Sequence, residues 1–286
     1  LTGQLCCDLL HRAGIPADAL VFLPGEGGVV GKVLVTDPRC AGVAFTGSTA
    51  TAFSINRAMA ATDQPLRPLI AETGGMNAVV VDSSALLEAV VQDTLDSAFR
   101  SAGQRCSAQR VLFVQDEIAE RAIEMLTGAM AELAVGDPGR LGTDVGPVID
   151  GKARDKLMAH AARMEREGRL LHRARLDEAC AHGTFVPPMA FEIDRMSRLT
   201  EEVFGPILHV VRWQAGHLDR VVDAVAATGY GLTFGVHSRI DETVEALTSR
   251  VKAGNIYVNR NIIGAVVGTQ PFGGEGLSGT GFKAGG

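Results

Sequence analysis

Short apolar runs that alternate with glycine-containing turns and helical segments are the feature that most restricts how this sequence can fold. The run Gly-Val-Ala-Phe-Thr at 42–46 passes into Gly47-Ser48-Thr49 and then into a helical segment, and this order recurs along the chain. Apolar runs of four or five residues are typical of buried strands, and strands that alternate with helices form parallel sheets. We therefore predict an α/β fold built on a parallel sheet.

The predicted elements cover most of the chain. Strands are expected at residues 19–23, 42–46, 68–71, 78–81, 110–114, 207–211, 232–236 and 255–259. Helices are expected at 3–13, 29–37, 49–59, 117–134, 151–168, 217–228 and 241–252, where apolar residues recur at helical spacing. A further helix is expected to begin at a cap formed by Asp82, Ser83 or Ser84 and to run to about Ser101.

Composition excludes several classes of function. Charged residues make up 21% of the chain and the formal net charge is −6, which argues against nucleic acid or an anionic membrane as the main partner. No run of eighteen apolar residues is present, so we expect no membrane span. The first residues, Leu-Thr-Gly-Gln, lack an initiator Met and a basic segment, which is typical of a start within a longer protein.

The cysteines and histidines predict a reducing compartment and no metal site. The five cysteines are an odd number without metal-ligand spacing, and the seven histidines form no ligand pair of the usual spacing. This usage suits the cytoplasm better than a disulfide framework. We interpret four of the cysteines as packing residues: Cys6, Cys7, Cys40 and Cys180.

Cys106 is the fifth cysteine and the first candidate for chemistry. It follows a helical segment that ends at Gly103 and precedes the strand expected at 110–114, where a loop would hold a thiol within reach of a substrate. A lone cysteine is more often a small buried hydrophobe, so both interpretations stand. Arg105 is the adjacent cation, to which we assign a structural or cofactor contact.

Two further segments have a functional and an ordinary interpretation. Glu72 lies between a predicted strand and Gly74-Gly75, where a pocket could raise its pKa and make it a general base; otherwise it is a solvated loop carboxylate. Gly47-Ser48-Thr49 opens a helix, where it could bind phosphate or simply cap that helix. No Gly-x-Gly-x-x-Gly fingerprint follows either of the first two predicted strands.

Five motifs in order resemble the aldehyde dehydrogenase superfamily over essentially the whole chain. They are Phe45-Thr46-Gly47-Ser48-Thr49, Glu72-Thr73-Gly74-Gly75, Gly103-Gln104-Arg105-Cys106, Glu201-Glu202-Val203-Phe204-Gly205-Pro206 and Pro271-Phe272-Gly273-Gly274. Within that superfamily, residues 103–107, 264–268 and 270–281 are most similar to the Δ1-pyrroline-5-carboxylate dehydrogenases, including the dehydrogenase module of bifunctional proline utilization A flavoenzymes.

The resemblance implies an aldehyde-dehydrogenase-like α/β fold with a partial Rossmann-type cofactor domain and an α/β catalytic domain. Residues 1–74 would be the C-terminal part of the NAD(P)-binding domain, 75–277 the catalytic domain and 278–286 a tail leading toward a further C-terminal segment. The implied reaction is NAD(P)-dependent oxidation of L-glutamate γ-semialdehyde to L-glutamate through a cysteine thioacyl intermediate, in proline catabolism.

Residue roles also follow from the resemblance, motif by motif. Cys106 matches the nucleophile and Glu72 the base that activates the deacylating water. The residues that match cofactor contacts are Gly47, Ser48, Thr49, Glu202 and Phe204, and those that match substrate contacts are Ser107, Gly264, Ala265 and Phe272.

Several alternatives stay open at this point. The family's oxyanion-hole asparagine and ribose-reading segment would precede residue 1, so the sequence does not separate NAD from NADP. The chain could also be a catalytically inert piece of such an enzyme, or the substrate another carboxy-aldehyde. The resemblance further implies a homo-oligomer, or a flavin-dependent proline dehydrogenase module in the parent protein.

Overall fold

The computed structural model describes residues 1–266 and 268–281, and its contacts divide into two compact units. One unit comprises Leu1–Ala44 and Ala50–Leu69; the other comprises Phe45–Thr49 and the described residues from Ile70 onward. Val267 and residues 282–286, the end of the predicted tail, lie outside the described residues.

The first unit is mostly helical. Its elements are α1 (Thr2–Arg12), the π-helical turn η1 (Gly27–Gly31), α2 (Lys32–Thr36) and most of α3 (Thr49–Ala60). Strands β1 (Val43–Thr46) and β2 (Leu69–Glu72) form a two-stranded sheet, and Phe45, Thr46 and residues 70–72 of these strands belong to the second unit. The helices therefore follow the sequence pattern in this part of the chain.

The strand expected at 19–23 is wrong. These residues form a turn and irregular chain, and Val21 and Leu23 are 63% and 58% exposed. An apolar run becomes a strand only when a neighbouring strand satisfies its backbone groups, and no described strand pairs with this segment.

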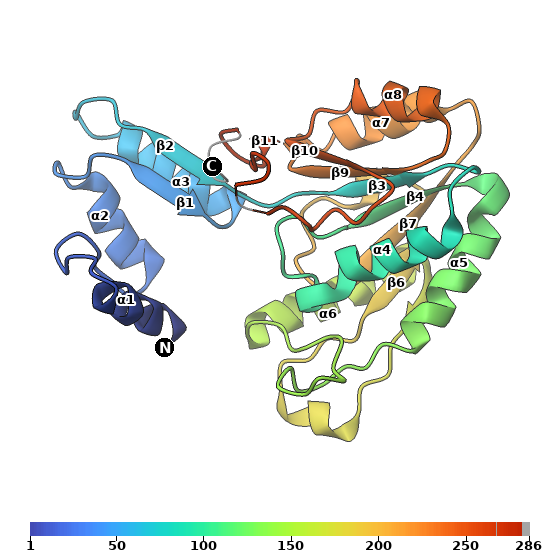
Figure 1. Ribbon diagram of the computed structural model, residues 1–286, viewed down its shortest axis with the longest axis horizontal. Helices are drawn as coiled ribbons and strands as arrows, with labels where there is room; N and C mark the ends of the chain where they lie inside the picture. The colour runs from blue at the N-terminus through green and yellow to red at the C-terminus, as the bar shows by residue number, and fades with distance from the viewer. Residues whose placement is uncertain (267, 282–286) are drawn as a thin grey trace. The chain divides into compact units, whose positions relative to one another are not determined.

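The second unit is built on a seven-stranded sheet in the order β10-β9-β3-β4-β7-β6-β5 (Figure 1). Every neighbouring pair is parallel except β5 and β6, which are antiparallel. The strands are β3 (Ala78–Val81), β4 (Val111–Gln115), β5 (Arg169–Arg173), β6 (Met189–Glu192), β7 (Ile207–Trp213), β9 (Thr233–His237) and β10 (Asn255–Val258). The central strands β3 and β4 are buried along their whole length, which is why they read as continuous apolar runs.

Helices cover both faces of this sheet. Figure 1 shows α4 (Leu87–Phe99) and α5 (Asp116–Ala131) on one face, and α7 (Leu218–Ala226) and α8 (Asp241–Thr248) on the other. Helix α6 (Gly151–Glu167) begins at Asp150, whose carboxylate accepts the N–H of Ala153 at 2.8 Å. The remaining elements are the 3₁₀ turns η2 (Arg100–Gly103), η3 (Glu178–His182) and η4 (Met196–Arg198), and the antiparallel pair β8 (Tyr230–Gly231) and β11 (Glu275–Gly276).

The start of α4 differs from the prediction. The helix begins at Leu87 after Leu86, and no side chain caps it. Asp82 instead accepts from the N–H and Oγ of Ser84, at 2.8 and 2.6 Å, and from Ser238 Oγ. The Asp82 carboxylate thus links the end of β3 to the end of β9. A residue type that commonly caps helices here forms a tertiary contact instead.

None of the helices in the described part of the chain is long and apolar enough to cross a membrane.

Candidate active site

The candidate site lies where the chain enters three neighbouring parallel strands. Glu72 comes shortly before β3, Cys106 before β4 and Glu202 before β7. Because β3 pairs with β4 and β4 with β7, all in parallel, their amino ends lie along one edge of the sheet. Open α/β sheets usually bind ligands at the opposite, carboxyl edge, so this placement is a distinctive property of the fold.

Cys106 lies in the thiol loop, residues 103–107, and is partly exposed. Asn77, just before β3, is hydrogen-bonded to this part of the chain. Its Nδ2 donates to the carbonyls of Cys106 and Ala108, at 2.7 and 2.9 Å. The N–H of Thr233 donates to the Asn77 Oδ1 at 3.1 Å. Asn77 thus fixes the backbone of Cys106 and Ala108, a role that no sequence motif indicated.

The chain reaches the thiol loop through a strained turn. Helix α4 ends at Phe99, two residues before its predicted end, and Ser101, Ala102 and Gly103 follow with φ values of 55°, 52° and 64°. Left-handed conformations are costly for residues with a Cβ and tend to persist at functional sites. Glycine is required at 103 for a second reason: a Cβ there would lie 2.2 Å from the carbonyl oxygen of Gly205.

Two carboxylates act on the Cys106 thiol. Burial raises the pKa of Cys106; Glu202 and Glu72 push it the same way, while the N–H of Ser107 favours the thiolate. Because the interaction between two charges weakens with distance, these effects indicate that three residues far apart in the sequence lie near one another. A partly exposed thiol with two carboxylates acting on it favours the interpretation of Cys106 as a reactive residue over that of a packing residue.

Glu72 is buried, with 5% of its surface exposed, so the alternative of a solvated loop carboxylate is wrong. Burial raises the pKa of Glu72 to about 7, although the N–H of Gly274 donates to its Oε2 at 2.9 Å. The other oxygen, Oε1, has no hydrogen-bond partner among the described residues. A carboxylate with a pKa near neutrality and a vacant acceptor atom is suited to take a proton from water.

Glu202 contrasts with Glu72 because it is paired. Arg110, which has no exposed surface, donates to the Glu202 Oε1 at 3.1 Å. Burial raises the pKa of Glu202, while Arg110 and the N–H of Gly75 act in the opposite direction. Gly74 makes room for the carboxylate, since a Cβ there would lie 1.7 Å from the Glu202 Oε2.

Arg110 also joins two loops. It donates to the carbonyls of Gly103 and Arg105 in the thiol loop, at 2.6 and 2.9 Å, and to that of Gly205 at 3.4 Å. Its guanidinium carbon lies 5.2 Å from the centre of the Phe204 ring. We name residues 202–205 the carboxylate loop. Arg105, for which the sequence left a structural or a cofactor contact open, makes a structural one: its side chain is exposed and donates to Ser101 Oγ at 3.1 Å.

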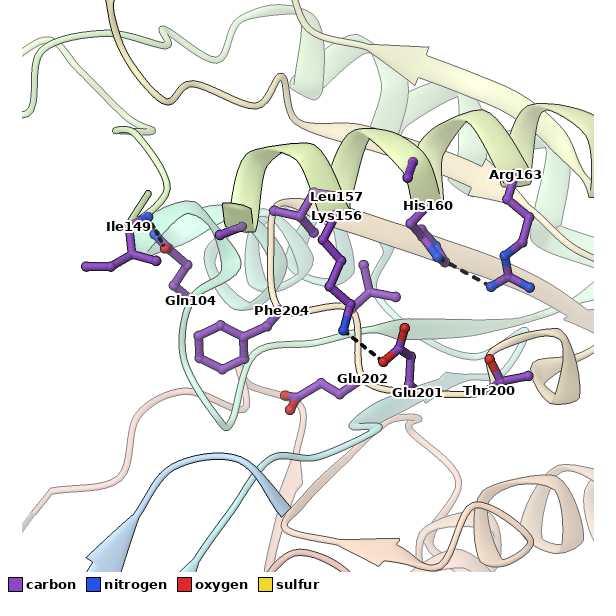
Figure 2. Close-up of a pocket in the computed structure, with 13 residues that line it drawn as sticks. Gln104, Ile149, Lys156, Leu157, His160, Arg163, Thr200, Glu201, Glu202 and Phe204 are labelled. Atoms are coloured by element: carbon purple, nitrogen blue, oxygen red, sulfur yellow. Dashed lines mark hydrogen bonds and ion pairs between the residues drawn. The ribbon is translucent and has the colours of Figure 1, made fainter. Parts of the chain in front are cut away.

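Glu202 and Phe204 face a cavity of about 460 Å³ (Figure 2). Lys156 and Glu201, which form an ion pair of 2.8 Å, also line it, and so does His160 of α6. Phe204 is 44% exposed, so an aromatic face is open to a ligand. A carboxylate and an aromatic ring on such a cavity are the groups that a ribose diol and a flat ring would meet.

Gly47, Ser48 and Thr49 lie at the start of α3. The N–H of Gly47 donates to the Glu72 carbonyl at 3.1 Å, which ties this turn to the end of β2. The hydroxyl of Thr49 donates to the Leu277 carbonyl at 3.2 Å. The Thr49 hydroxyl therefore donates its hydrogen bond within the protein. The backbone N–H groups of the turn lie at the N-terminus of a twelve-residue helix, where an anion could bind.

Three of the four predicted substrate residues lie in two segments that are linked through Ser97. Ser107 is buried beside the nucleophile, and Gly264 and Ala265 follow β10. Ser97 of α4 accepts the N–H of Gln109 on its carbonyl and the N–H of Ile262 on its hydroxyl, at 2.9 and 3.1 Å. The link between the two segments is thus indirect.

Phe272, the fourth predicted substrate residue, directly precedes the Gly273-Gly274 turn that meets Glu72. That turn packs closely, since a Cβ on Gly273 would lie 2.8 Å from the Glu72 Oε1. Phe272 is therefore the residue directly before a turn that packs against the Glu72 carboxylate.

Among the described residues, no cluster of three or more histidine, cysteine or acidic side chains could hold a metal ion. The five cysteines are all free thiols in this part of the chain. The chemistry available at the site is that of a thiol, two carboxylates and a buried guanidinium.

Comparison with known proteins gives consistent matches. The profile described as "Aldehyde dehydrogenase family" matches residues 1–286. The "Bifunctional protein PutA" of Klebsiella aerogenes is 54% identical over 286 residues, which cover 97% of this chain and 22% of that protein.

Solved structures with similar folds carry the same kinds of name. A variant of Bradyrhizobium japonicum Proline Utilization A (PutA) matches with a TM-score of 0.95 and 57% identity, over 99% of this chain and 29% of that one. The 1-pyrroline-5-carboxylate dehydrogenase from Thermus with bound NAD matches with a TM-score of 0.89 and 35% identity, over 96% of this chain and 53% of that one. The chain thus spans between about a fifth and a half of the length of these proteins.

Proposed function

The chain belongs to the aldehyde dehydrogenase family, and from this premise we propose that it carries the thiol site of an NAD-dependent enzyme that oxidises L-glutamate γ-semialdehyde to L-glutamate. This aldehyde is the open form of Δ1-pyrroline-5-carboxylate, the compound in the name of the Thermus relative. The reaction would belong to proline catabolism.

The observation that carries the proposal is that buried Arg110 holds Glu202 to the loop of Cys106, while Glu72 acts on the same thiol. One of the two carboxylates has a pKa of about 7 and a vacant oxygen, and the other is held by a buried arginine. A nucleophile with a base and a fixed binding group beside it is the arrangement that covalent catalysis requires.

The chain's own residues would act in two stages. Cys106 would attack the aldehyde carbon as a thiolate and, once the substrate is oxidised, hold the acyl group as a thioester. NAD, when bound, accepts the hydride that leaves the aldehyde carbon. Glu72 would then take a proton from the water that hydrolyses the thioester, using its vacant Oε1.

The residues present fit a dinucleotide cofactor. Glu202 and Phe204 lie on a cavity of about 460 Å³, and glycine at 74 leaves room for the carboxylate. Gly47, Ser48 and Thr49 at the start of α3 would contact the pyrophosphate, for which a helix N-terminus is suited. The Thermus relative with bound NAD favours NAD over NADP.

For the substrate, we propose that Ser107 and the backbone of Gly264 and Ala265 hold the α-carboxylate, with Phe272 on the wall of the substrate channel. Backbone N–H groups bind a carboxylate without a flexible cation. Ser97 supports placing these residues in one site because it is hydrogen-bonded to both segments. Another carboxy-aldehyde is the alternative substrate.

We also propose that residues 1–74 are the end of the cofactor domain and 75–277 the catalytic domain of a longer polypeptide. The relatives named as bifunctional support a parent with a second activity, for which we propose proline dehydrogenase; a homo-oligomer is a further proposal. The free thiols suit a reducing compartment such as the cytoplasm.

The decisive experiment measures aldehyde-dependent NADH formation by the intact protein and its Cys106→Ala variant. We expect the variant to lose the activity, and an unchanged rate would contradict the mechanism. For the substrate, kcat/KM for glutamate semialdehyde should exceed that for succinic semialdehyde by more than about tenfold, or 1.4 kcal/mol. An inactive wild-type protein would favour the alternative that this chain is a catalytically inert piece of the family's enzyme.

A further inference from the structure

We propose that Arg110 is a positioning residue that holds the thiol loop and the carboxylate loop in register and supplies the positive charge that favours the Cys106 thiolate. The cofactor part of this inference rests on the proposed function, whereas the part on thiol reactivity does not. Neither part follows from the motifs, because Arg110 stands at the start of an apolar strand.

The bonding of Arg110 is specific to the two loops. Its side chain has no exposed surface, and it makes four hydrogen bonds from its two terminal nitrogens. Two of them reach the thiol loop and two reach the carboxylate loop. An arginine remains charged in proteins, and a buried charge is tolerated only when it is paired and hydrogen-bonded.

The two loops are in direct contact at this point. A Cβ on Gly103 would lie 2.2 Å from the Gly205 carbonyl oxygen, so the backbones cross without a side chain between them. The guanidinium donates to the carbonyls of both crossing residues and lies over the Phe204 ring. A displacement of Arg110 would therefore move the nucleophile and the cofactor residues together.

The charges that face Cys106 make the guanidinium important for reactivity. Glu72 and Glu202 both disfavour the thiolate. Burial lowers the pKa of Arg110, while Glu202 and the Cys106 thiolate act in the opposite direction, so the cation and the thiolate attract each other. Without Arg110, the thiolate would face two carboxylates and no compensating charge.

Arg105 supplies a matched control. It is the same residue type, one position before the nucleophile, but its side chain is exposed and its guanidinium donates to Ser101 rather than to Glu202. A general effect of positive charge in this segment would be seen at Arg105 as well. A specific effect of the buried cation would be seen only at Arg110.

The experiment compares the intact wild-type protein with Arg110→Met, Arg110→Lys and Arg105→Met. Alkylation by iodoacetamide is followed as a function of pH on the peptide that contains Cys106, which separates this thiol from the other four. Binding of NAD is titrated in parallel, without aldehyde. Both readouts work whether or not the protein oxidises glutamate semialdehyde.

For Arg110→Met we expect the pH midpoint of Cys106 alkylation to rise by about one unit, as when a close opposite charge is lost. We expect the Kd for NAD to rise about tenfold or more, as when a charge-assisted hydrogen bond is lost. Arg110→Lys keeps the charge but not the fork of donors, so it should preserve the midpoint and still weaken NAD binding. Arg105→Met should change neither quantity by more than about twofold.

The inference is wrong if Arg110→Met keeps the wild-type midpoint and affinity, or if Arg105→Met shifts them equally. If Arg110→Met does not fold, Arg110→Lys decides, because an unchanged Kd for NAD in that variant would overturn the positioning role. A wild-type protein that binds NAD and shows these shifts but oxidises no aldehyde would contradict the proposed function and leave this inference in place.

Discussion

Glu72 and Glu202 are the same residue type, lie near the same edge of one sheet and act on the same thiol, yet their oxygens are satisfied in opposite ways. Glu202 accepts from Arg110 and from the N–H of Gly75. Glu72 accepts from the N–H of Gly274, and its Oε1 has no partner among the described residues.

The difference shows that neighbours, rather than burial, separate the two roles. Burial raises the pKa of both carboxyl groups. A carboxylate held by a buried cation keeps its charge and its position, which suits binding. A carboxylate with a vacant oxygen and a pKa of about 7 can exchange protons near neutrality, which suits catalysis.

Removing the base at Glu72 tests this contrast with the largest expected effect. Glu72→Gln should lower the steady-state rate of NADH formation by about 10²–10⁴-fold, the contribution of a general base. Because the thiol remains, a first burst of NADH close to one equivalent should persist in stopped-flow measurements. In the wild type the steady-state rate should rise with pH through about 7, as Glu72 loses its proton. A variant without the burst would show that Glu72 acts before the thioester forms.

Breaking the ion pair at Glu202 tests the other carboxylate. Glu202→Gln leaves the Arg110 charge buried without a counter-ion, so the free energy of unfolding should fall by about 2–4 kcal/mol in urea denaturation. Glu201→Gln is the control, because its ion pair with Lys156 joins side chains that are 62% and 63% exposed. That variant should change stability by less than about 1 kcal/mol. Equal losses would contradict the distinction between the buried and the exposed pair.

Replacing Glu72 should change the free energy of unfolding in the opposite direction from replacing Glu202. The pKa of Glu72 is raised from 4.5 to about 7 in the folded protein, so the folded state binds more protons than the unfolded state between these values. The unfolding free energy of the wild type therefore falls as pH rises from about 4.5 through 7. Glu72→Gln should be more stable than wild type by about 1–3 kcal/mol at pH 8, and similar to it at pH 5. A variant that is less stable at pH 8 would show that the carboxylate is satisfied after all.

The sequence predicted much of the fold because central parallel strands are continuous apolar runs. The predicted runs at 78–81, 110–114 and 207–211 correspond to β3, β4 and β7. The same criterion failed at 19–23, since an apolar run does not reveal whether a partner strand exists. It also missed β5, which is partly exposed, and the pair β8 and β11, which are two residues long. The four-residue strand β6 was missed as well, although three of its residues are buried.

The candidate site was predictable only for residues that stand in motifs. Arg110 and Asn77 were not predicted, because their contacts depend on which strands are neighbours and in what register, and the sequence does not specify either. One signal was present for Arg110: a charged residue directly before a run of apolar residues that is expected to be buried. Such a residue needs a counter-ion, and Glu202 is that partner.

The crossing of the thiol loop and the carboxylate loop at Gly103 and Gly205 has a consequence for anyone who redesigns this protein. Substitutions around Glu202, the proposed cofactor contact, would be transmitted through Arg110 to the backbone that directly precedes Cys106. In the proposed enzyme, cofactor preference and aldehyde preference would thus be coupled, and variants selected for one property should be screened for the other.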